Sequence, residues 1–532
     1  MTTETPNPYD QVPYASHAYE SSAPDVLART ALLFGMEPAS PERCRVLEIG
    51  CASGGNLGPL AYVYPESTFV GIDLSQVQIE QGRRFLEPFG LKNIELMQYD
   101  IMDVGEDFGQ FDYIISHGVY SWVPDPVRER ILALCRDHLA PHGVAYVSYN
   151  TYPGWHMSEM IRDMMLYHTA NFTDPTKKVD QARALLDFLA QSYPKDEEKP
   201  YAVLLRSEAE RLRDLSGSYL FHDHLEEHNA PVYFHQFMER AFAHDLDYLG
   251  ESHFHSMLPM HLPAHVQEIL KRIGNDLYRV EQYMDFLRNR GFRATLLVHD
   301  ARTQKRHIEW PTMVQFYYGC NGRFAEDPGD LRANDEVEMI RKDARMKTTV
   351  PLLKAAFRVL FDTWPRSISF EDLLREARVL LGSPVEEGDQ ALLGSGLLNC
   401  FASNMVEVRA TPARVGELTD RPTASAWARA EVEDNASRLT NLRHVSGGAA
   451  AVFRPFLLLL DGTRNEEEVV EGLVRLVKKG ELTIKNPEGQ LLEGDEQIRA
   501  VIESTAGSAM QTAVQSSMIM PQRAPRSSPG PA

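Results

Sequence analysis

The chain has 532 residues, which is too long for one hydrophobic core and predicts several domains. Its hydrophobic content of 43% and its charged content of 24% are close to globular averages, which excludes a largely disordered chain. The formal net charge of −21 argues against a nucleic-acid groove as the main feature, because phosphate binding needs clustered Lys and Arg.

From Arg45 onward, short apolar runs alternate with helical patterns, which is typical of a parallel sheet wound with helices. This alternation predicts strands at 45–50, 68–73, 94–98, 111–116 and 143–149. The helices expected between them cover 56–63, 76–88 and 127–138, and Asp125-Pro126 supplies a cap and a first-turn proline for the last of these.

After residue 150 the alternation gives way to amphipathic helical patterns over 157–215, with a charged break at 195–199. This predicts a helical insertion, whose apolar positions either form a core or bury against a second subunit in a homodimer. A helix at 232–244 and strands at 247–251 and 293–298 are then expected to complete the sheet.

The fold class expected from these patterns is α/β, with a Rossmann-like sheet and helical insertions. An N-terminal arm or lid covers 1–40, and the sheet domain covers 41–303 with its insertion at about 153–230. A mixed α/β middle domain follows at 304–410, with a strand-like run at 313–318. A linker at 411–425, a helix-rich domain at 426–504 and a disordered tail at 505–532 complete the chain.

The segment Val46-Leu-Glu-Ile-Gly-Cys-Ala-Ser-Gly-Gly-Asn56 leads from a strand through a glycine turn into a helix. Gly50 and Gly54 allow a ligand to approach the backbone closely, because they carry no Cβ. Their spacing differs from the GxGxxG of pyrophosphate sites, and Glu48 precedes them. An acidic strand end suits a positively charged sulfonium nucleoside better than a phosphate.

Three further strand ends extend this pattern. Asp73 ends the second strand, where a carboxylate can accept both ribose hydroxyls, and Asp100 ends the third, where it can accept the adenine amino group. Ser116-His117-Gly118 ends the fourth strand and is expected near the transferred methyl group. The alternative is that the glycines serve only a tight turn and that the acids only cap helices.

This ordered set resembles the class I S-adenosylmethionine-dependent methyltransferases over roughly residues 40–150. The resemblance implies S-adenosylmethionine as cofactor, with Glu48, Gly50 and Gly54 on its methionine side, Asp73 at the ribose and Asp100 at the adenine. The residues expected to bind the cofactor are Tyr14, Glu48, Gly50, Cys51, Ala52, Gly54, Asn56, Asp73, Leu74, Asp100, Ile101, Ser116, His117 and Gly118.

Further segments carry a narrower resemblance over most of the chain, namely those at 9–16, 120–124, 219–227 and 281–286. They are similar to bacterial methyltransferases with a methyltransferase regulatory region, a group that includes the rickettsial protein lysine methyltransferases of outer-membrane proteins. The resemblance implies a winged-helix-like C-terminal domain and a protein lysine as the methyl acceptor.

Candidate acceptor-side residues follow the fourth and fifth strands. Methyl transfer needs a neutral, aligned amine, so positioning and desolvation matter most. We expect catalytic roles for His117, Tyr120, Trp122 and Asn150, and substrate contacts for Tyr152 and Trp155. The alternatives are hydrophobic packing for the aromatic residues, anchoring or cofactor packing for His117, and a turn role for Asn150. Tyr14 either folds over the cofactor as a lid or packs elsewhere.

Two histidine groups, at 222–228 and 253–265, lack cysteine partners, so we expect helix capping and hydrogen bonding rather than bound metal. The cysteines show no zinc-ligand spacing, the first residues do not resemble a signal peptide, and the most apolar run, at 449–460, is too short to cross a bilayer. We therefore expect a cytoplasmic enzyme with neither membrane insertion nor a nucleic-acid partner.

The function expected is methylation of a protein lysine. One alternative is methylation of a small metabolite, which would require a site closed around a compact ligand. The other is a non-catalytic, cofactor-sensing interaction protein.

Overall fold

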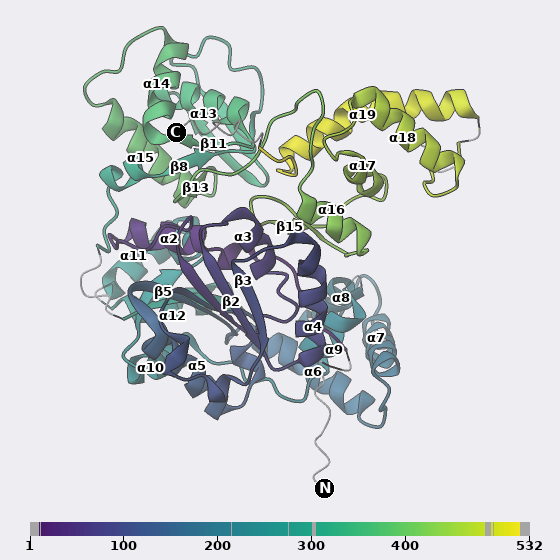
Figure 1. The fold of residues 1–532 in the computed structure, drawn as a ribbon. Helices are drawn as coiled ribbons and strands as arrows, with labels where there is room; N and C mark the ends of the chain where they lie inside the picture. Colours follow the sequence, from purple (N-terminus) through teal and green to yellow (C-terminus); the bar gives the residue numbers. More distant parts are fainter. Residues whose placement is uncertain are drawn as a thin grey trace, which may run out of the picture. The chain divides into compact units, whose positions relative to one another are not determined.

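The computed structural model describes residues 10, 12–213, 215–274, 276–299, 305–484, 491–492 and 494–521. The chain forms two compact units (Figure 1). The first comprises Met1–Ser16, Cys44–Gly58 and Ser67–Thr303, and the second comprises His17–Arg43, Pro59–Glu66 and Gln304–Ala532. The arm predicted at 1–40 is therefore shared between the two units, and its first nine residues lie outside the described ones.

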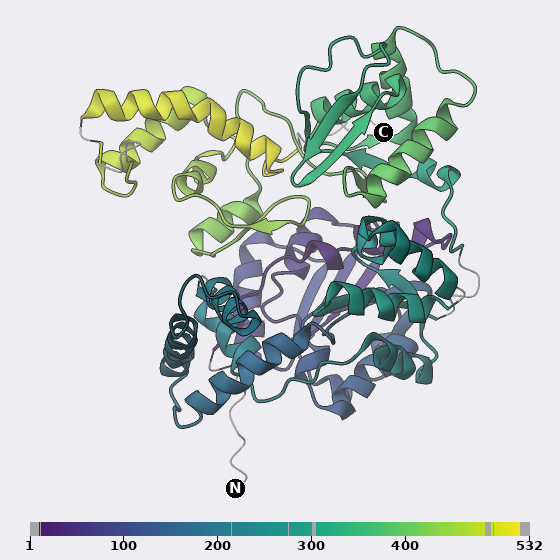
Figure 2. The ribbon, with the colours of Figure 1, turned by 180° about the vertical axis from the view of Figure 1, so that it is seen from behind.

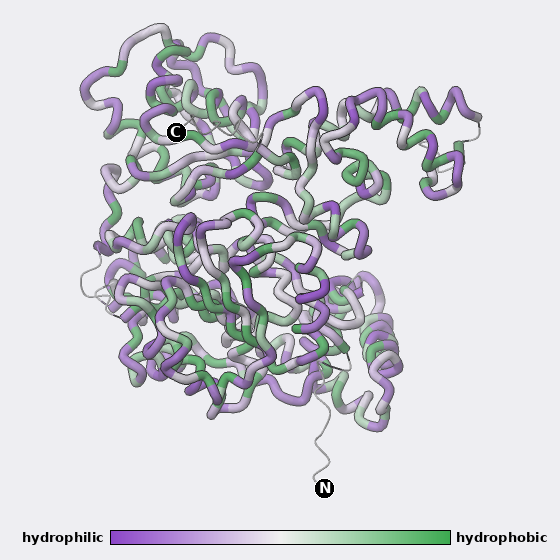
Figure 3. The backbone as a smooth tube through the Cα atoms, in the orientation of Figure 1, coloured by the Kyte–Doolittle hydropathy of each residue, from purple (hydrophilic) through white to green (hydrophobic). Residues whose placement is uncertain are grey.

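A seven-stranded sheet organises the first unit, in the order β3-β2-β1-β4-β5-β7-β6. Strands β1 to β5 are parallel, whereas β7 runs antiparallel to both β5 and β6. Strands buried on both faces need continuous apolar runs, which is why the sequence pattern located them; Figure 3 shows hydrophobic colour along them. The strands are β1 (Arg45–Ile49), β2 (Thr68–Asp73), β3 (Ile94–Gln98), β4 (Phe111–Ser116), β5 (Leu139–Asn150), β6 (Asp247–Glu251) and β7 (Phe292–Val298).

Helices connect these strands. Helix α4 packs on β2 and β3, and α5 packs on β4 and β5. Ser75 caps α4, but α5 begins at Asp125 itself, so Asp125 lies in the first turn instead of at the capping position that the sequence predicted. The helices are α3 (Leu57–Val63), α4 (Gln76–Leu86), α5 (Asp125–His138), α10 (Phe234–Ala243), α11 (Ala264–Ile273) and α12 (Leu277–Arg288), with short 3-10 turns that include η3 (Ile101–Asp103) and η5 (Tyr120–Trp122).

The helical insertion between β5 and β6 has a small core of its own. Leu186, Leu205 and Leu220 are among its buried members. Figure 2 shows these helices in blue. The charged break predicted at 195–199 separates the second helix of the insertion from the third. The insertion consists of α6 (Trp155–Thr169), α7 (Pro175–Gln191), α8 (Pro200–Arg213) and α9 (Gly217–His224).

The second unit begins with η1 (Glu20–Ser22) and α2 (Pro24–Leu33) and continues with the middle domain. The single strand predicted at 313–318 is wrong: the 3-10 turn η8 (Trp310–Gln315), with Pro311 near its start, covers the first half, and only β8 (Tyr317–Gly319) is extended. Two three-stranded sheets form here, β11-β10-β9 and β12-β8-β13. Their elements are β9 (Arg323–Phe324), β10 (Val337–Arg341), β11 (Ala344–Thr348), α13 (Pro351–Thr363), β12 (Ile368–Ser369), α14 (Phe370–Leu381), α15 (Asp389–Ala402) and β13 (Glu407–Arg409).

The helix-rich C-terminal domain packs around Leu457, Val469 and Ile502. Its last helix, α19 (Asp495–Gln515), extends past Thr505, where the sequence predicted a disordered tail. Ala506, Met510 and Ala513 account for the difference, because they recur at helical spacing and are buried in this core. The other elements are α16 (Ala426–Glu433), β14 (Leu439–Thr440), β15 (Ser446–Gly447), α17 (Phe453–Leu459) and α18 (Glu466–Lys478). None of the described helices combines the length and the apolar composition needed to cross a membrane.

Candidate active site

The glycine turn after β1 requires glycine at two positions. Gly50 and Gly54 have φ angles of 72° and 74°, a left-handed conformation that side chains oppose. A Cβ on Gly50 would lie 2.4 Å from Cγ2 of Val119. The Gly50 N–H donates to the Ile72 carbonyl at 2.8 Å, which fastens the turn to the neighbouring strand. The backbone is therefore held open for close approach by a ligand.

Glu48 and Asn56 lie buried beneath this turn. The Asn56 side-chain amide donates to Oε1 of Glu48 at 2.7 Å, whereas Oε2 has no hydrogen-bond partner among the described residues. Burial raises the pKa of Glu48 to about 8, with a smaller contribution from the charge of Asp73. Burial also raises the pKa of the Cys51 thiol, so this cysteine is no thiolate nucleophile. The unpaired, buried carboxylate oxygen suits a cationic group.

Asp73 ends β2 and joins two loops. One carboxylate oxygen accepts from the Ser75 N–H and the other from the Ala52 N–H, both at 2.8 Å. Burial raises the pKa of this carboxyl, and the two backbone donors oppose the shift. A carboxylate offers about four acceptor sites, so Asp73 retains capacity for two hydroxyls. The next residue, Leu74, is exposed.

Asp100 follows β3 and caps η3. Its side chain accepts from the Met102 N–H at 2.9 Å and is otherwise exposed. Ile101 is partly buried against the core. Asp100 therefore caps a 3-10 turn, and its exposure leaves acceptor sites for an adenine amino group.

The end of β4 presents His117 between a buried serine and a glycine. Ser116 is fully buried, and the N–H of Gly118, at φ 68°, donates to the Ser148 hydroxyl at 2.8 Å. Nδ1 of His117 lies 2.9 Å from the Tyr146 hydroxyl. His117 is thus held by a side-chain hydroxyl, and its ring is partly exposed.

Tyr120 does not belong to this site. Its side chain is fully buried in the sheet core, with its ring centroid 5.2 Å from that of Phe237 and 6.1 Å from that of Tyr149. The expected catalytic role fails because η5 turns this side chain inward. Trp122, two residues later, remains half-buried, and its ring lies edge-on to that of Trp155 at 6.3 Å.

Asn150 and Trp155 bring buried polar atoms to the end of β5. Asn150 is buried, its N–H donates to the Ser121 hydroxyl, and Nδ2 has no partner in the described part of the chain. The same holds for Nε1 of Trp155. Tyr152 donates its hydroxyl to Glu159, a residue that the sequence analysis did not select. The only signal for Glu159 was its place one helical turn beyond Trp155.

A short N-terminal strap, defined as residues 12–16 with Asp10, contacts the glycine turn, the loop after β2 and helix α9. The Gly55 N–H donates to the Ser16 hydroxyl at 2.8 Å, and the Ser75 hydroxyl donates to Asp10 at 2.5 Å. The ring of Tyr14 lies edge-on to that of His222 at 5.6 Å. The strap therefore connects the glycine turn and the end of β2 with α9, which fits the lid role considered for Tyr14.

The first histidine group contributes hydrogen bonds, and the second contains a ring contact. Nε2 of His222 lies 2.6 Å from the Val12 carbonyl, and Nε2 of His228 lies 2.8 Å from the Val123 carbonyl. The rings of His253 and His255 are 6.0 Å apart. Within the described ranges, the His, Cys, Asp and Glu side chains form no group of three that would hold a metal ion.

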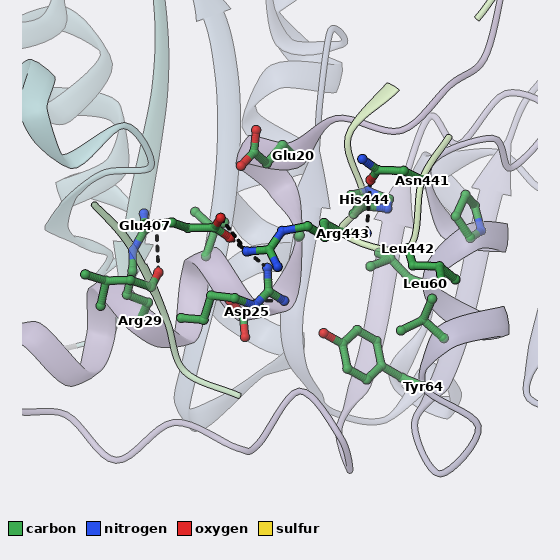
Figure 4. Close-up of a pocket in the computed structure, with 16 residues that line it drawn as sticks. Glu20, Asp25, Arg29, Leu60, Tyr64, Glu407, Asn441, Leu442, Arg443 and His444 are labelled. Carbon is green, nitrogen blue, oxygen red and sulfur yellow. Dashed lines mark hydrogen bonds and ion pairs between the residues drawn. The ribbon is translucent and has the colours of Figure 1, made fainter. Parts of the chain in front are cut away.

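The second unit contains a separate buried pocket, which Figure 4 shows. Several of its charges are paired: Glu407 contacts Arg443 and Arg409, and Asp25 accepts from the Thr411 N–H and hydroxyl. These arginines hold the pKa of Glu407 down at about 2 against the effect of burial. The paired charges of Glu407, Arg443, Arg409 and Asp25 make this part of the pocket a structural ion network.

Comparisons with known proteins cover both units. A methyltransferase domain matches residues 46–143, a "Predicted methyltransferase regulatory domain" matches 216–299, and a "PKMT, C-terminal winged helix domain" matches 420–518. The regulatory domain includes α9, which holds the strap, and the winged-helix domain includes all of α19.

Individual proteins similar to this chain include further methyltransferases. An uncharacterized protein of Rickettsia prowazekii, RP789, is 37% identical over 94% of this chain and 91% of its own length. The structure of PKMT2 from Rickettsia typhi in complex with AdoHcy is 31% identical, with a TM-score of 0.87, over 95% of this chain and all of that one. A trans-aconitate 2-methyltransferase of Deinococcus radiodurans is 30% identical over 23% of this chain and 44% of its own.

These similarities confirm the fold class and S-adenosylmethionine as the cofactor. The chain therefore belongs to the family of S-adenosylmethionine-dependent methyltransferases with a regulatory region and a PKMT winged-helix domain, which includes PKMT2 of Rickettsia typhi.

Proposed function

We propose that this methyltransferase transfers the methyl group to Nζ of a lysine in a protein. The observation that carries the proposal is the similarity to PKMT2 across 95% of the chain, which includes the winged-helix domain. The similarity to the trans-aconitate methyltransferase covers less than a quarter of the chain. Domains beyond the cofactor fold are consistent with a macromolecular acceptor.

We propose that the residues around the glycine turn hold the cofactor. Glu48 places its unpaired carboxylate oxygen against the ammonium of the methionine moiety, and Gly50 and Gly54 let that moiety approach the backbone. Asp73 accepts the ribose hydroxyls, and Asp100 accepts the adenine amino group. S-adenosylmethionine supplies an electrophilic methyl group on a sulfonium. Flanking contacts are assigned to Tyr14, Cys51, Ala52, Asn56, Leu74, Ile101, Ser116 and Gly118.

On the acceptor side, the amine must be neutral, close and aligned with the methyl–sulfur bond. The half-buried rings of Trp122 and Trp155 desolvate the aliphatic stem of the lysine. The buried Asn150 amide orients Nζ of the acceptor lysine by hydrogen bonding. His117, held by Tyr146, lies where it can accept the proton that this nitrogen loses. Tyr120 is not part of this proposal.

Two further expectations from the sequence remain predictions. The insertion helices are candidates for a homodimer interface, and the cytoplasm is the expected location. Neither changes the chemistry proposed for the acceptor.

The direct test is to incubate the purified protein with methyl-tritiated S-adenosylmethionine and an extract of host proteins. Acid hydrolysis should then recover the label as methylated lysine. Label confined to small molecules would favour a metabolite acceptor, and binding of the cofactor without any transfer would favour the sensor alternative.

A further inference from the structure

An aromatic face begins where β5 ends. Asn150, the last residue of β5, pairs with Phe292, the first residue of β7. Phe292 is partly exposed, and its ring centroid lies 6.1 Å from that of His117. Two residues after Asn150, the ring of Tyr152 stacks on that of His156, with 3.9 Å between centroids and 17° between planes. The face thus adjoins the position proposed for methyl transfer.

Rings from other elements continue this surface. Tyr233, just before α10, lies 5.3 Å from Tyr152 and 6.2 Å from Phe286, measured between ring centroids. Phe286 in turn lies 5.9 Å from Tyr283, and both belong to α12. Phe286 is 48% exposed and Tyr283 is 39% exposed. With Phe292 on β7, these exposed rings come from two different elements, and neighbouring exposed rings are typical of a contact surface.

One carboxylate lies among these rings. Glu159, on α6, accepts from the Tyr152 hydroxyl at 3.1 and 3.2 Å, and Nδ1 of His156 lies 3.4 Å from it. Its side chain is 36% exposed. Among the described residues, no lysine or arginine lies within ion-pair distance of Glu159. Arg162 on the same helix acts on Glu159 only from beyond ion-pair distance, so the carboxylate keeps acceptor sites beside the aromatic rings.

This combination selects for a cation. Ammonium and guanidinium groups are attracted both to a carboxylate and to the faces of aromatic rings. The reacting lysine nitrogen must become neutral, so holding it beside an anion would oppose its deprotonation. A second basic residue of the substrate, which keeps its charge throughout the reaction, is therefore the better ligand for Glu159.

We propose that this aromatic face, made by Tyr152, His156, Glu159, Tyr233 and Phe286, docks the protein segment that carries the acceptor lysine. Glu159 binds a second, permanently charged Lys or Arg side chain of that segment, and the rings pack against its aliphatic parts. The inference rests on the proposed function, and it adds a sequence preference: methylated lysines have a basic residue nearby. Glu159 positions the acceptor and takes no part in the transfer itself.

The test uses the full-length enzyme, methyl-tritiated S-adenosylmethionine and host protein extract at increasing concentration. Glu159→Gln keeps an oxygen for the Tyr152 hydroxyl and removes the charge, and Phe286→Ala removes a ring on a different helix. Asp180→Asn is the matched control, because Asp180 is an exposed acid on α7. Affinity for S-adenosylhomocysteine reports whether each variant is folded.

Loss of a half-exposed ion pair should raise KM for the protein acceptor by about fivefold in Glu159→Gln, with kcat nearly unchanged. Phe286→Ala should raise KM as well, and Asp180→Asn should not. Mass spectrometry of the methylated peptides should show basic residues enriched near the modified lysine for the unaltered enzyme, and a weaker enrichment for Glu159→Gln.

Three results would overturn the inference. Labelled lysine with an unchanged KM and unchanged site preference in Glu159→Gln would refute it and leave the proposed function standing. Sedimentation showing that Phe286→Ala dissociates a dimer would assign the face to a second copy of the chain. Label that never enters protein would refute the proposed function together with this inference.

Discussion

Binding of S-adenosylhomocysteine should depend on pH through Glu48. Burial raises the pKa of this carboxyl to about 8, so the free protein holds Glu48 mostly neutral at neutral pH. The ligand carries the same ammonium as the cofactor, and a cation beside the carboxyl favours its ionised form. Binding should therefore release a proton, and affinity should rise with pH until Glu48 is ionised without the ligand.

The size of the effect follows from that pKa. With a pKa of about 8, roughly 1% of Glu48 is ionised at about pH 6 and about half at about pH 8. If binding lowers the pKa to about 5 or below, affinity should rise about fiftyfold over this interval, and about 0.9 proton should be released at neutral pH. Titration calorimetry in two buffers of different ionisation enthalpy measures both quantities.

Glu48→Gln is the matched control, because it preserves the acceptor for the Asn56 amide and cannot ionise. Its affinity should be weak and nearly independent of pH in the same interval. Equal affinity of the unaltered protein at both ends of the interval, with no proton released, would refute the placement of Glu48 at the ammonium.

Three other changes test separate parts of the structure. Gly50→Ala should lower the melting midpoint and abolish S-adenosylhomocysteine binding, because positive φ costs about 1–2 kcal/mol and the new Cβ collides with a valine; normal binding by calorimetry would contradict this. Asp73→Asn should weaken binding about ten- to a hundredfold through loss of charged hydrogen bonds to ribose, and it should lower the melting midpoint because the amide nitrogen cannot accept from a backbone N–H; an unchanged Kd would remove ribose from this site. Arg409→Ala should reduce the free energy of unfolding by about 3–5 kcal/mol in urea denaturation, because it leaves Asp25 and Glu407 buried without this partner. An unshifted urea transition would show that the network contributes little.

The parallel strands were predictable because burial on both faces forces a continuous apolar run. The first four strands of the sheet begin where the sequence placed them. The fifth, β5, starts earlier, at Leu139, through a stretch that contains Pro141 and Gly143 and pairs irregularly with β4. The local sequence pattern therefore locates the strands. It fails to predict a strand end where pairing with a neighbouring strand extends beyond the apolar run.

Side-chain direction was less predictable. Tyr120 and Trp122 are close in sequence, yet η5 points the first into the core and leaves the second half-buried. Composition does not distinguish them, because both are aromatic and follow the same strand. The sequence pattern missed the end of α19 for a related reason. Ala506 and Ala513 are small residues within a stretch rich in polar residues, and their burial depends on the packing of another helix against them.

The candidate site shows the same division between residue type and environment. The sequence identified Glu48 as an acid beside a glycine turn, and together with the glycine spacing it favoured a sulfonium nucleoside over a phosphate ligand. Its protonation state depends on full burial and on one hydrogen bond to Asn56, and both are tertiary properties. Glu159 is the converse case: it is an ordinary helical glutamate in the sequence, and only its contacts with Tyr152 and His156 in the folded chain make it a candidate for binding a cation. Motif order therefore predicts where the chemistry lies, whereas burial and long-range contacts decide what each acid there can bind.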